Sequence, residues 1–501
     1  MFDLVNRVGW ESRFHNRQEF PGPFPQRNAA MIKCMRIAAI AFFVWGCILG
    51  NGSLWAESKG RPNVVVILAD DLGWGDLGCF GAPDLETPHV DRLAREGMRM
   101  INFYANCPVC SPTRASLLTG CYPDAVGVPG VIRTHSNNSW GYLNPQVELL
   151  PAFLAQAGYH TALVGKWHLG LDRPNIPTAR GFAYFHGFLG DMMDDYFNHR
   201  RHGINYMREN ETEIDPAGHA TDLFTRWACE YIDSRADSAR RGQPFFLYLA
   251  YNAPHVPIQP PDEWLQRYRQ RHPDAPERRA KLAALIEHMD WGIGEVLNTL
   301  DRSGLAEETL VIFTSDNGGQ LDVGARNGPY RSGKGTMYEG GIRVPMVVRW
   351  PGRIAPGSQS DAVAITMDLF ASILDAAGAV VPEGRTGVTL LPIWKGEKNR
   401  LPSRDLFWVR LEGGVFSYAA RRGDYKLIRP APQKGKQPPD ELYDLAADPY
   451  EKQDLRTTRP ELYEEMVRLL EEHIQSVKDI PWRDERGLGP GEIPPATTST
   501  R

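Results

Sequence analysis

The sequence lacks the features that would place it outside the ordinary globular proteins. It has no basic excess: 56 Lys and Arg residues stand against 61 Asp and Glu residues, a formal net charge of -5 at pH 7, which argues against a general nucleic-acid binder. With 42% hydrophobic and 23% charged residues, a disordered or fibrous chain is excluded. No internal repeat is visible. The 501 residues predict one large folded domain and a smaller one.

The chain also has no apolar run long enough to span a bilayer, which takes roughly 20 residues. The run 37–49 follows Lys33 and Arg36 and leads through small and polar residues to Ala56, the layout of a secretory signal peptide. We therefore expect an exported protein, periplasmic or secreted, with cleavage near Ala56 and no stable membrane span. Lipoprotein anchoring through Cys47 remains a minor alternative.

Cysteine is scarce, and its distribution is informative. Two of the seven cysteines lie in the signal segment, which leaves an odd number in the mature chain: Cys79, Cys107, Cys110, Cys121 and Cys229. An odd count in an exported protein indicates that one thiol has a role other than a disulfide. Cys107 and Cys110 form a C-x-x-C spacing, typical of a redox pair, a disulfide or half a zinc site. No second C-x-x-C exists, and the pairing of the other four cysteines stays open.

The hydrophobic pattern predicts an α/β fold with a mostly parallel central sheet covered on both faces. Buried strands are expected at 64–69, 162–164, 245–250, 310–314 and 344–348, and helices at 91–98, 149–157 and 280–300. Further on, short strands are expected at 406–409, 417–421 and 425–428, followed by an amphipathic helix over 462–477. We predict an N-terminal extension with signal peptide (1–56), a catalytic domain (57–386), a small antiparallel sheet with a covering helix (387–483) and a loose tail (484–501).

Two acidic pairs follow predicted buried strands. Asp70 and Asp71 close one strand, and Asp316 and Asn317 close another. Either pair alone is equally typical of a turn or a helix cap. Open α/β sheets bind ligands at the carboxyl ends of their strands, so the two pairs are expected to share a crevice. They offer only oxygen ligands, which favour a hard cation such as calcium or magnesium over zinc.

Between these strands lies a rarer pattern, Cys110-x-Pro112-x-Arg114, which continues through residues 115–120 as Ala-Ser-Leu-Leu-Thr-Gly. It resembles the signature of the formylglycine-dependent sulfatases. The resemblance covers nearly everything from residue 61 to about 477, with further motifs at 165–170, 253–255, 316–318, 333–335, 339–345 and 441–445. It implies an alkaline-phosphatase-like α/β/α sandwich with a smaller C-terminal antiparallel sheet.

The resemblance also implies the chemistry. A formylglycine-generating maturation enzyme would oxidise Cys110, and the hydrated aldehyde would attack sulfur with one oxygen and expel sulfate with the other. A divalent cation, calcium rather than magnesium, would be bound by residue 110 together with Asp70, Asp71, Asp316 and Asn317. It would lower the pKa of the nucleophile and neutralise sulfate oxygens.

The cations and histidines of the shared motifs receive roles in the same way. Arg114, Lys166 and Lys334 are expected around the sulfate. His255 is expected to protonate the leaving alcohol and His168 to accept a proton during release of sulfate. On most chains such residues are solvated charges or structural histidines, but here each of them lies in a family motif.

Other polar and aromatic residues are weaker candidates. The segment 191–202 forms a polar cluster that reads either as a substrate-binding loop or as a solvated one. Plausible pocket-rim residues are Arg326, Arg331 and Glu339, while Phe407, Trp408 and Arg410 are candidates for stacking on a saccharide, although core packing is the commoner fate of such aromatics.

The leading hypothesis is therefore a sulfuric ester hydrolase acting on sulfated carbohydrate. A phosphate or phosphonate ester hydrolase of the same fold is the first alternative. A catalytically silent binding protein with an unmodified Cys110 thiol is the second. The sugar, the position of its sulfate, endo or exo action and the oligomeric state are not determined by the sequence.

Overall fold

The computed structural model describes residues 60–135 and 138–483. The predicted N-terminal extension and signal peptide (1–56) and the predicted tail (484–501) lie outside the described residues. Among the described residues, no helix combines the length and the hydropathy needed to cross a membrane. The boundary predicted near residue 387 stays a prediction.

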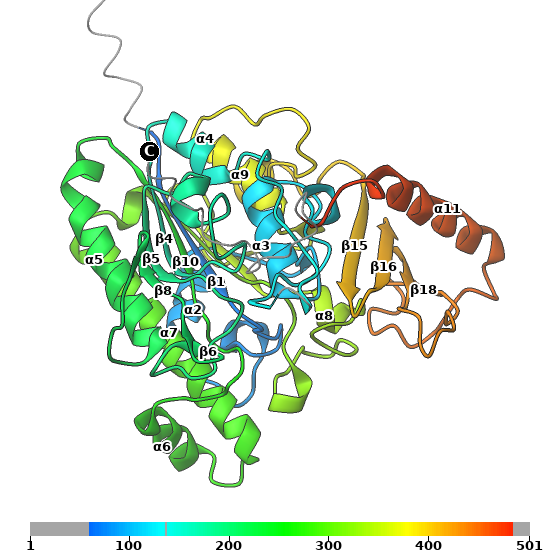
Figure 1. Ribbon diagram of the computed structural model, residues 1–501, viewed down its shortest axis with the longest axis horizontal. Helices are drawn as coiled ribbons and strands as arrows, with labels where there is room; N and C mark the ends of the chain where they lie inside the picture. The colour runs from blue at the N-terminus through cyan, green and yellow to red at the C-terminus, as the bar shows by residue number, and fades with distance from the viewer. Residues whose placement is uncertain (1–59, 136–137, 484–501) are drawn as a thin grey trace, which may run out of the picture. The chain divides into compact units, whose positions relative to one another are not determined.

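A mostly parallel central sheet organises the structure, as the sequence predicted (Figure 1). Its strand order is β13-β2-β12-β11-β1-β10-β4-β5-β8-β9. Five central strands run parallel, namely β11 (Thr309–Ser315), β1 (Asn63–Ala69), β10 (Phe245–Ala250), β4 (His160–Lys166) and β5 (Tyr184–Phe188). The flanking strands are β12 (Met346–Arg349), β2 (Met98–Met100), β13 (Ser358–Ser360), β8 (Met207–Glu209) and β9 (Thr212–Glu213). The strand predicted at 344–348 is β12, and it runs antiparallel to β11.

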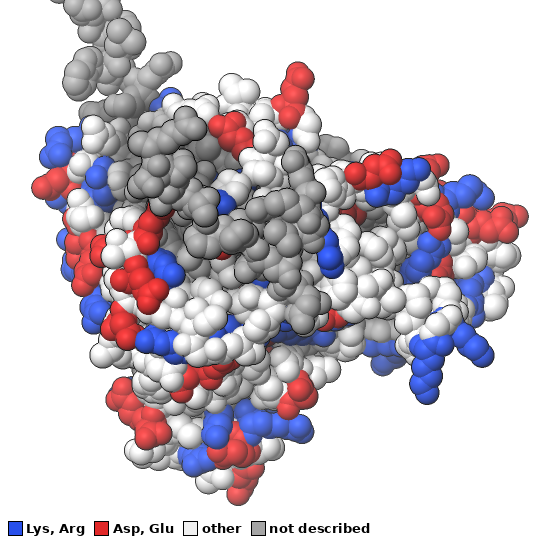
Figure 2. Space-filling view, viewed as in Figure 1, with Lys and Arg blue, Asp and Glu red and all other residues white. Residues whose placement is uncertain are grey.

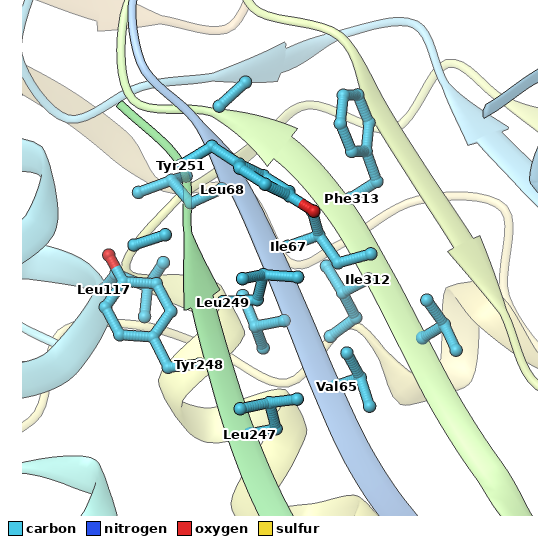
Figure 3. Close-up of a cluster of buried hydrophobic side chains, with 14 of the residues drawn as sticks. Val65, Ile67, Leu68, Leu117, Leu247, Tyr248, Leu249, Tyr251, Ile312 and Phe313 are labelled. Carbon is cyan, nitrogen blue, oxygen red and sulfur yellow. The ribbon is translucent and has the colours of Figure 1, made fainter. Parts of the chain in front are cut away.

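The central strands form the core because they are apolar on both faces. Every residue of β1, β10 and β11 is buried. Val65 and Ile67 of β1 lie between the neighbouring strands, with Leu247 and Leu249 on one side and Ile312 on the other (Figure 3). Burial on both faces is the usual state of a parallel sheet, and it explains why these strands appear in the sequence as continuous apolar runs.

Two sets of helices cover the sheet (Figure 1). One set packs around α7 and comprises α2 (Pro88–Glu96), α5 (Ala220–Arg240), α6 (Asp262–Arg271) and α7 (Glu277–Arg302). The other set comprises α3 (Cys110–Thr119), α4 (Leu150–Gln156), α9 (Asp368–Ala376) and α10 (Leu391–Trp394). Short elements complete this part: β3 (Phe103–Tyr104), β14 (Ala364–Ile365), β6 (Arg200–Arg201), β7 (Ile204–Asn205) and α8 (Glu339–Ile342).

A separate antiparallel sheet follows, as predicted. It consists of β15 (Asp405–Glu412), β16 (Val415–Arg422), β17 (Tyr425–Arg429) and β18 (Glu441–Asp444). Helix α11 (Pro460–Val477) covers one face and buries Met466, Leu469 and Leu470 against it (Figure 1). On the face of the molecule in Figure 2, basic and acidic side chains are interspersed, without a broad patch of one sign among the coloured residues.

A buried ionic cluster joins this sheet to the rest of the fold. The Lys426 ammonium of β17 donates to Glu339 at 2.9 Å and to Glu451 at 2.8 Å, and all three side chains are 0% exposed. Tyr104 donates a further hydrogen bond to Glu339 at 2.7 Å. Glu339 is therefore a structural residue, and the rim position considered for it is not observed.

Replacing Lys426 by methionine is expected to lower the free energy of unfolding by about 3–5 kcal/mol, because it removes the buried cation that Glu339 and Glu451 share and leaves Glu339 to its longer contact with Arg343 at 3.3 Å. Urea denaturation measures the change. Lys478→Met, at an exposed position, is the matched control and should stay within about 0.5 kcal/mol of wild type. Equal stability of the two variants would contradict the role assigned to the buried cluster.

Candidate active site

The two acidic pairs meet at one edge of the central sheet. Since β1 and β11 are parallel neighbours with Ala69 opposite Ser315, the residues that follow them emerge side by side. The Asp71 amide donates to Asp316 Oδ1 at 3.1 Å. Carboxylate oxygens of Asp70, Asp71 and Asp316 all lie within 4.8 Å of one another, and the three residues are buried. The crevice expected from the strand pattern therefore holds a compact carboxylate triad.

The backbone around this edge is unusually constrained. Asp71 has φ 67° and His168 has φ 61°, left-handed conformations that cost residues other than glycine roughly 1–3 kcal/mol and that cluster at functional sites. Gly318, directly after Asn317, is required for space, because a Cβ atom there would lie 1.9 Å from the Gly340 carbonyl oxygen. The Asp-Asn-Gly motif is thus fixed by backbone packing as well as by its side chains.

Cys110 is the first residue of α3 and is 4% exposed. Its sulfur lies within 4.8 Å of a carboxylate oxygen of Asp70 and a ring nitrogen of His255. Burial raises the pKa of the Cys110 thiol to about 11, so as an unmodified thiol it would be protonated at neutral pH and a weak nucleophile.

The C-x-x-C spacing forms no disulfide in this structure. All five cysteines of the described chain are free, and the Cys107 thiol donates to the Val409 carbonyl oxygen at 3.0 Å. None of the disulfide pairings left open by the sequence is present among the described residues.

Each cation predicted at the site pairs with the carboxylate triad, and Arg114 contacts two of its members, since it also lies 3.6 Å from Asp70. Arg114 donates to Asp316 Oδ2 through Nε at 3.0 Å and through a terminal nitrogen at 2.7 Å. Lys166 donates to Asp70, and Lys334 donates to Asp71 at 2.6 Å. Sequence reasoning placed all three around the sulfate. In the structure Arg114 and Lys166 are 0% exposed, and of the three only Lys334 lines the open cavity.

The carboxylates influence one another strongly. Burial, together with the charge of Asp70, raises the pKa of Asp316 to about 7. Burial acts in the same direction on Asp70, but the nearby charges of Lys166, His255 and Arg114 outweigh it and lower the pKa of Asp70. Crowding three carboxylates in a buried site therefore favours protonation of one of them, and a bound cation would remove that tendency.

The two histidines present different nitrogens to the site. His255 Nδ1 bonds the Val256 carbonyl at 2.7 Å, so its Nε2 faces Lys334 Nζ at 3.1 Å. His168 Nε2 bonds the Ile132 carbonyl at 2.7 Å, and its buried Nδ1 has no hydrogen-bond partner among the described residues. Burial, followed by Lys166, lowers the pKa of His168 well below 6.5. His168 is therefore neutral at pH 7, and its buried Nδ1 carries a lone pair that no donor among the described residues satisfies.

A cavity of about 370 Å³ opens above these groups. Four of the predicted site residues line it, and we call them the floor of the cavity: Cys110, His168, His255 and Lys334. The other lining residues, called its walls and mouth, are Val109, Val131, Arg133, Asp191, Met192, Gln320, Asp322, Gly335, Arg410 and Glu412. Sequence reasoning named Asp191 and Arg410 but missed Arg133 and Glu412, whose neighbours in the sequence carry no motif.

The weaker candidates are distributed differently from expectation. Within 191–202 only Asp191 and Met192 line the cavity, and Asp194 pairs with Arg201 at 2.7 Å. The proposed rim residues Arg326 and Arg331 instead pair with Asp84 and Glu441. The aromatic candidates pack against other side chains of the protein. The Phe407 ring stacks on the His473 ring with 4.2 Å between the ring centroids, and Trp408 is 1% exposed.

Comparisons with known proteins agree with this architecture. The sulfatase family model matches residues 62–379, and the model for the C-terminal part of N-sulphoglucosamine sulphohydrolase matches residues 332–479. The chain is 37% identical over 399 residues to N-acetylgalactosamine-6-sulfatase of Mus musculus, covering 75% of this chain and 73% of the relative. It is 35% identical over 398 residues to arylsulfatase A of Homo sapiens, covering 73% and 74% of the two chains.

A solved structure shares the fold as well. The crystal structure of Ps i-CgsB in complex with k-i-k-neocarrahexaose superposes with a TM-score of 0.76 at 30% identity, covering 85% of this chain and 96% of that one.

The fold and the paired carboxylates and cations define a hydrolase of anionic esters with the alkaline-phosphatase-like architecture. More narrowly, the chain belongs to the sulfatase family, and it is a sulfuric ester hydrolase.

Proposed function

We propose that this enzyme hydrolyses sulfate esters of carbohydrates through residue 110, after a maturation enzyme has converted Cys110 to formylglycine. The observation that carries the proposal is the position of the Cys110 sulfur, within 4.8 Å of both Asp70 and His255 at the floor of an open cavity. The names of the similar proteins, an N-acetylgalactosamine-6-sulfatase and a structure bound to a neocarrahexaose, support a sugar substrate. The signal-like segment 37–49 supports export.

The residues present fit a divalent cation. Asp70 Oδ1 and Asn317 Oδ1 are buried without a hydrogen-bond partner among the described residues, beside the carboxylate triad. Oxygen-only donors suit calcium, or less well magnesium. We propose that Asp70, Asp71, Asp316, Asn317 and the modified residue 110 hold this ion. When bound, it would neutralise sulfate oxygens and lower the pKa of the nucleophile.

The charges at the centre support an anionic substrate. Three cations (Arg114, Lys166 and Lys334) balance three carboxylates (Asp70, Asp71 and Asp316), so a divalent ion would leave a net charge of about +2. Lys334, at the cavity surface, would contact the sulfate. Arg114 and Lys166 would act from behind by orienting the carboxylates they hydrogen-bond.

The histidines divide the proton transfers. His255 Nε2 would carry the proton given to the leaving alcohol, because its Nδ1 is held by the Val256 carbonyl. His168 would accept a proton at its unpaired Nδ1 during release of sulfate. The ring orientations support these roles, since each histidine is anchored to a backbone carbonyl through one nitrogen, which turns His255 Nε2 toward Lys334 and leaves His168 Nδ1 without a partner among the described residues.

Rates on matched substrates test the proposal. Protein from a host containing the maturation enzyme would be assayed with calcium on an aryl sulfate, the matched aryl phosphate, and a panel of monosulfated hexoses and N-acetylhexosamines. We expect desulfation of at least one sugar and faster hydrolysis of the sulfate than of the phosphate. Strong aryl sulfate turnover with no activity on any sugar would reject the carbohydrate substrate. Faster phosphate hydrolysis would reject the assignment to sulfate.

Removal of the general acid should depend on the leaving group. His255→Ala is expected to lower kcat on a sugar sulfate by about 10²–10⁴-fold, because an alkoxide is a poor leaving group without a proton. The loss on 4-nitrophenyl sulfate should be much smaller, since nitrophenolate leaves unprotonated. Comparing kcat for the two substrates measures this, with wild-type circular dichroism as the folding check. Equal losses on both substrates would contradict the acid role of His255.

A further inference from the structure

The mouth of the cavity carries a polar array supplied by two parts of the fold. Arg410 and Glu412 alternate along β15, so both face the cavity from one side of the strand. The Leu411 amide between them donates to the Pro129 carbonyl at 2.8 Å. This contact brings the segment containing Arg133 alongside β15, so Arg133 lines the same cavity.

Glu412 contacts both arginines, but it accepts a hydrogen bond from only one of them. It accepts from Arg133 at 3.4 Å and lies 3.8 Å from Arg410. The guanidinium of Arg410 donates no hydrogen bond to any residue within 60–135 or 138–483, and the Nε atoms of both arginines are buried and unpartnered. Each arginine side chain is 25% exposed. Because guanidinium groups carry five N–H donors, this array retains unused donors beside an acceptor carboxylate.

The charge of the mouth differs from that of the floor. Its cations Arg133 and Arg410, together with Arg201, which pairs with Asp191 at 3.0 Å, stand against the three acidic residues Asp191, Asp322 and Glu412, so the net charge is 3 − 3 = 0. The proposed catalytic centre beneath the floor, with its bound divalent ion, has a net positive charge. A sulfate is therefore attracted to the floor, whereas a second anionic group at the mouth meets no excess of positive charge.

We propose that Arg133, Glu412 and Arg410 recognise neighbouring hydroxyl groups of a sugar ring whose only anionic group is one sulfate. The same residues would disfavour a second anionic group on that ring. A hydroxyl can donate to Glu412 while it accepts from an arginine, so a pair of hydroxyls matches the alternating donors and acceptor. This inference rests on the proposed function and defines the alcohol part of its substrate.

The first test removes the unused donors. Arg410→Ala is expected to lower kcat/KM for the best monosulfated sugar about tenfold or more relative to kcat/KM for 4-nitrophenyl sulfate. The sugar loses the charge-assisted hydrogen bonds between its hydroxyl groups and Arg410, whereas the aryl group has no hydroxyl groups and loses none. Arg226→Ala, at an arginine of α5 with 57% side-chain exposure, is the control and should leave the ratio unchanged. An unchanged ratio in Arg410→Ala overturns the inference while leaving sulfatase activity intact. Wild-type protein that hydrolyses neither ester overturns the proposed function itself.

The second test reverses the charge preference. Wild-type enzyme is expected to favour the monosulfated sugar over the same sugar with an added sulfate by about tenfold in kcat/KM, and Glu412→Gln should reduce that preference severalfold by removing one negative charge. Circular dichroism checks that the variant folds. A wild-type preference for the disulfated sugar, or a preference that Glu412→Gln leaves unchanged, would overturn the inference.

Discussion

Cys110→Ala is expected to lower kcat for sulfate ester hydrolysis by at least about 10⁴-fold, to the level of the assay background, because it removes the atom that becomes the nucleophile. The substitution should leave the fold intact. Within residues 60–135 and 138–483 the Cys110 sulfur makes no hydrogen bond that the substitution would remove, and only a small buried group is deleted, which costs about 1 kcal/mol in the free energy of unfolding. Steady-state assays and thermal denaturation measure the two effects.

The matched control is Cys229→Ala, a half-buried free cysteine of α5. It should keep wild-type turnover, since no proposed step involves it. Activity retained by Cys110→Ala in protein of wild-type stability would refute the assigned nucleophile. Loss of activity in both variants would point to a general requirement for thiols.

Asp70→Asn is expected to weaken calcium binding by about 100-fold or more, because it removes a charged oxygen ligand from a site whose affinity depends on ligand charge. In wild type, free calcium at about 100 times its Kd should add about 2.7 kcal/mol to the free energy of unfolding. The Tm should therefore rise with calcium in wild type and respond far less in the variant. Chelation should also abolish wild-type turnover.

Isothermal titration calorimetry measures the affinity without relying on activity. Asp215→Asn, whose side chain is 66% exposed at the surface, is the control and should bind calcium as wild type does. Wild-type affinity in Asp70→Asn, or a Tm of the wild type that does not respond to calcium or magnesium, would contradict the cation site.

The sheet and its polar edge were predictable because their physical causes are local. A strand buried on both faces appears as a continuous apolar run, as at 64–69, and parallel strands place their last residues at one edge. The strand pattern alone therefore places Asp70 and Asp316 together. The approach of Cys110 to this edge came from a motif resemblance, since no periodicity predicts which loop packs there.

The cavity walls were less predictable because they depend on tertiary pairing. Arg133 lines the cavity because its segment is held by contacts with residues far apart in the sequence, among them the hydrogen bond from the Leu411 amide to the Pro129 carbonyl and that between His168 and the Ile132 carbonyl. Glu339 shows the opposite case. Its place beside Lys334 in the sequence indicated a rim residue, but a buried lysine from the C-terminal sheet neutralises it inside the protein. Sequence spacing carries no signal for either outcome.

The most direct test of the account is the mass of the peptide that contains position 110, from protein purified from its native host. We predict the mass of a formylglycine peptide, lower than that encoded by cysteine, together with reactivity toward an aldehyde-specific hydrazide probe. An unmodified cysteine at position 110 in fully active enzyme would contradict the central claim.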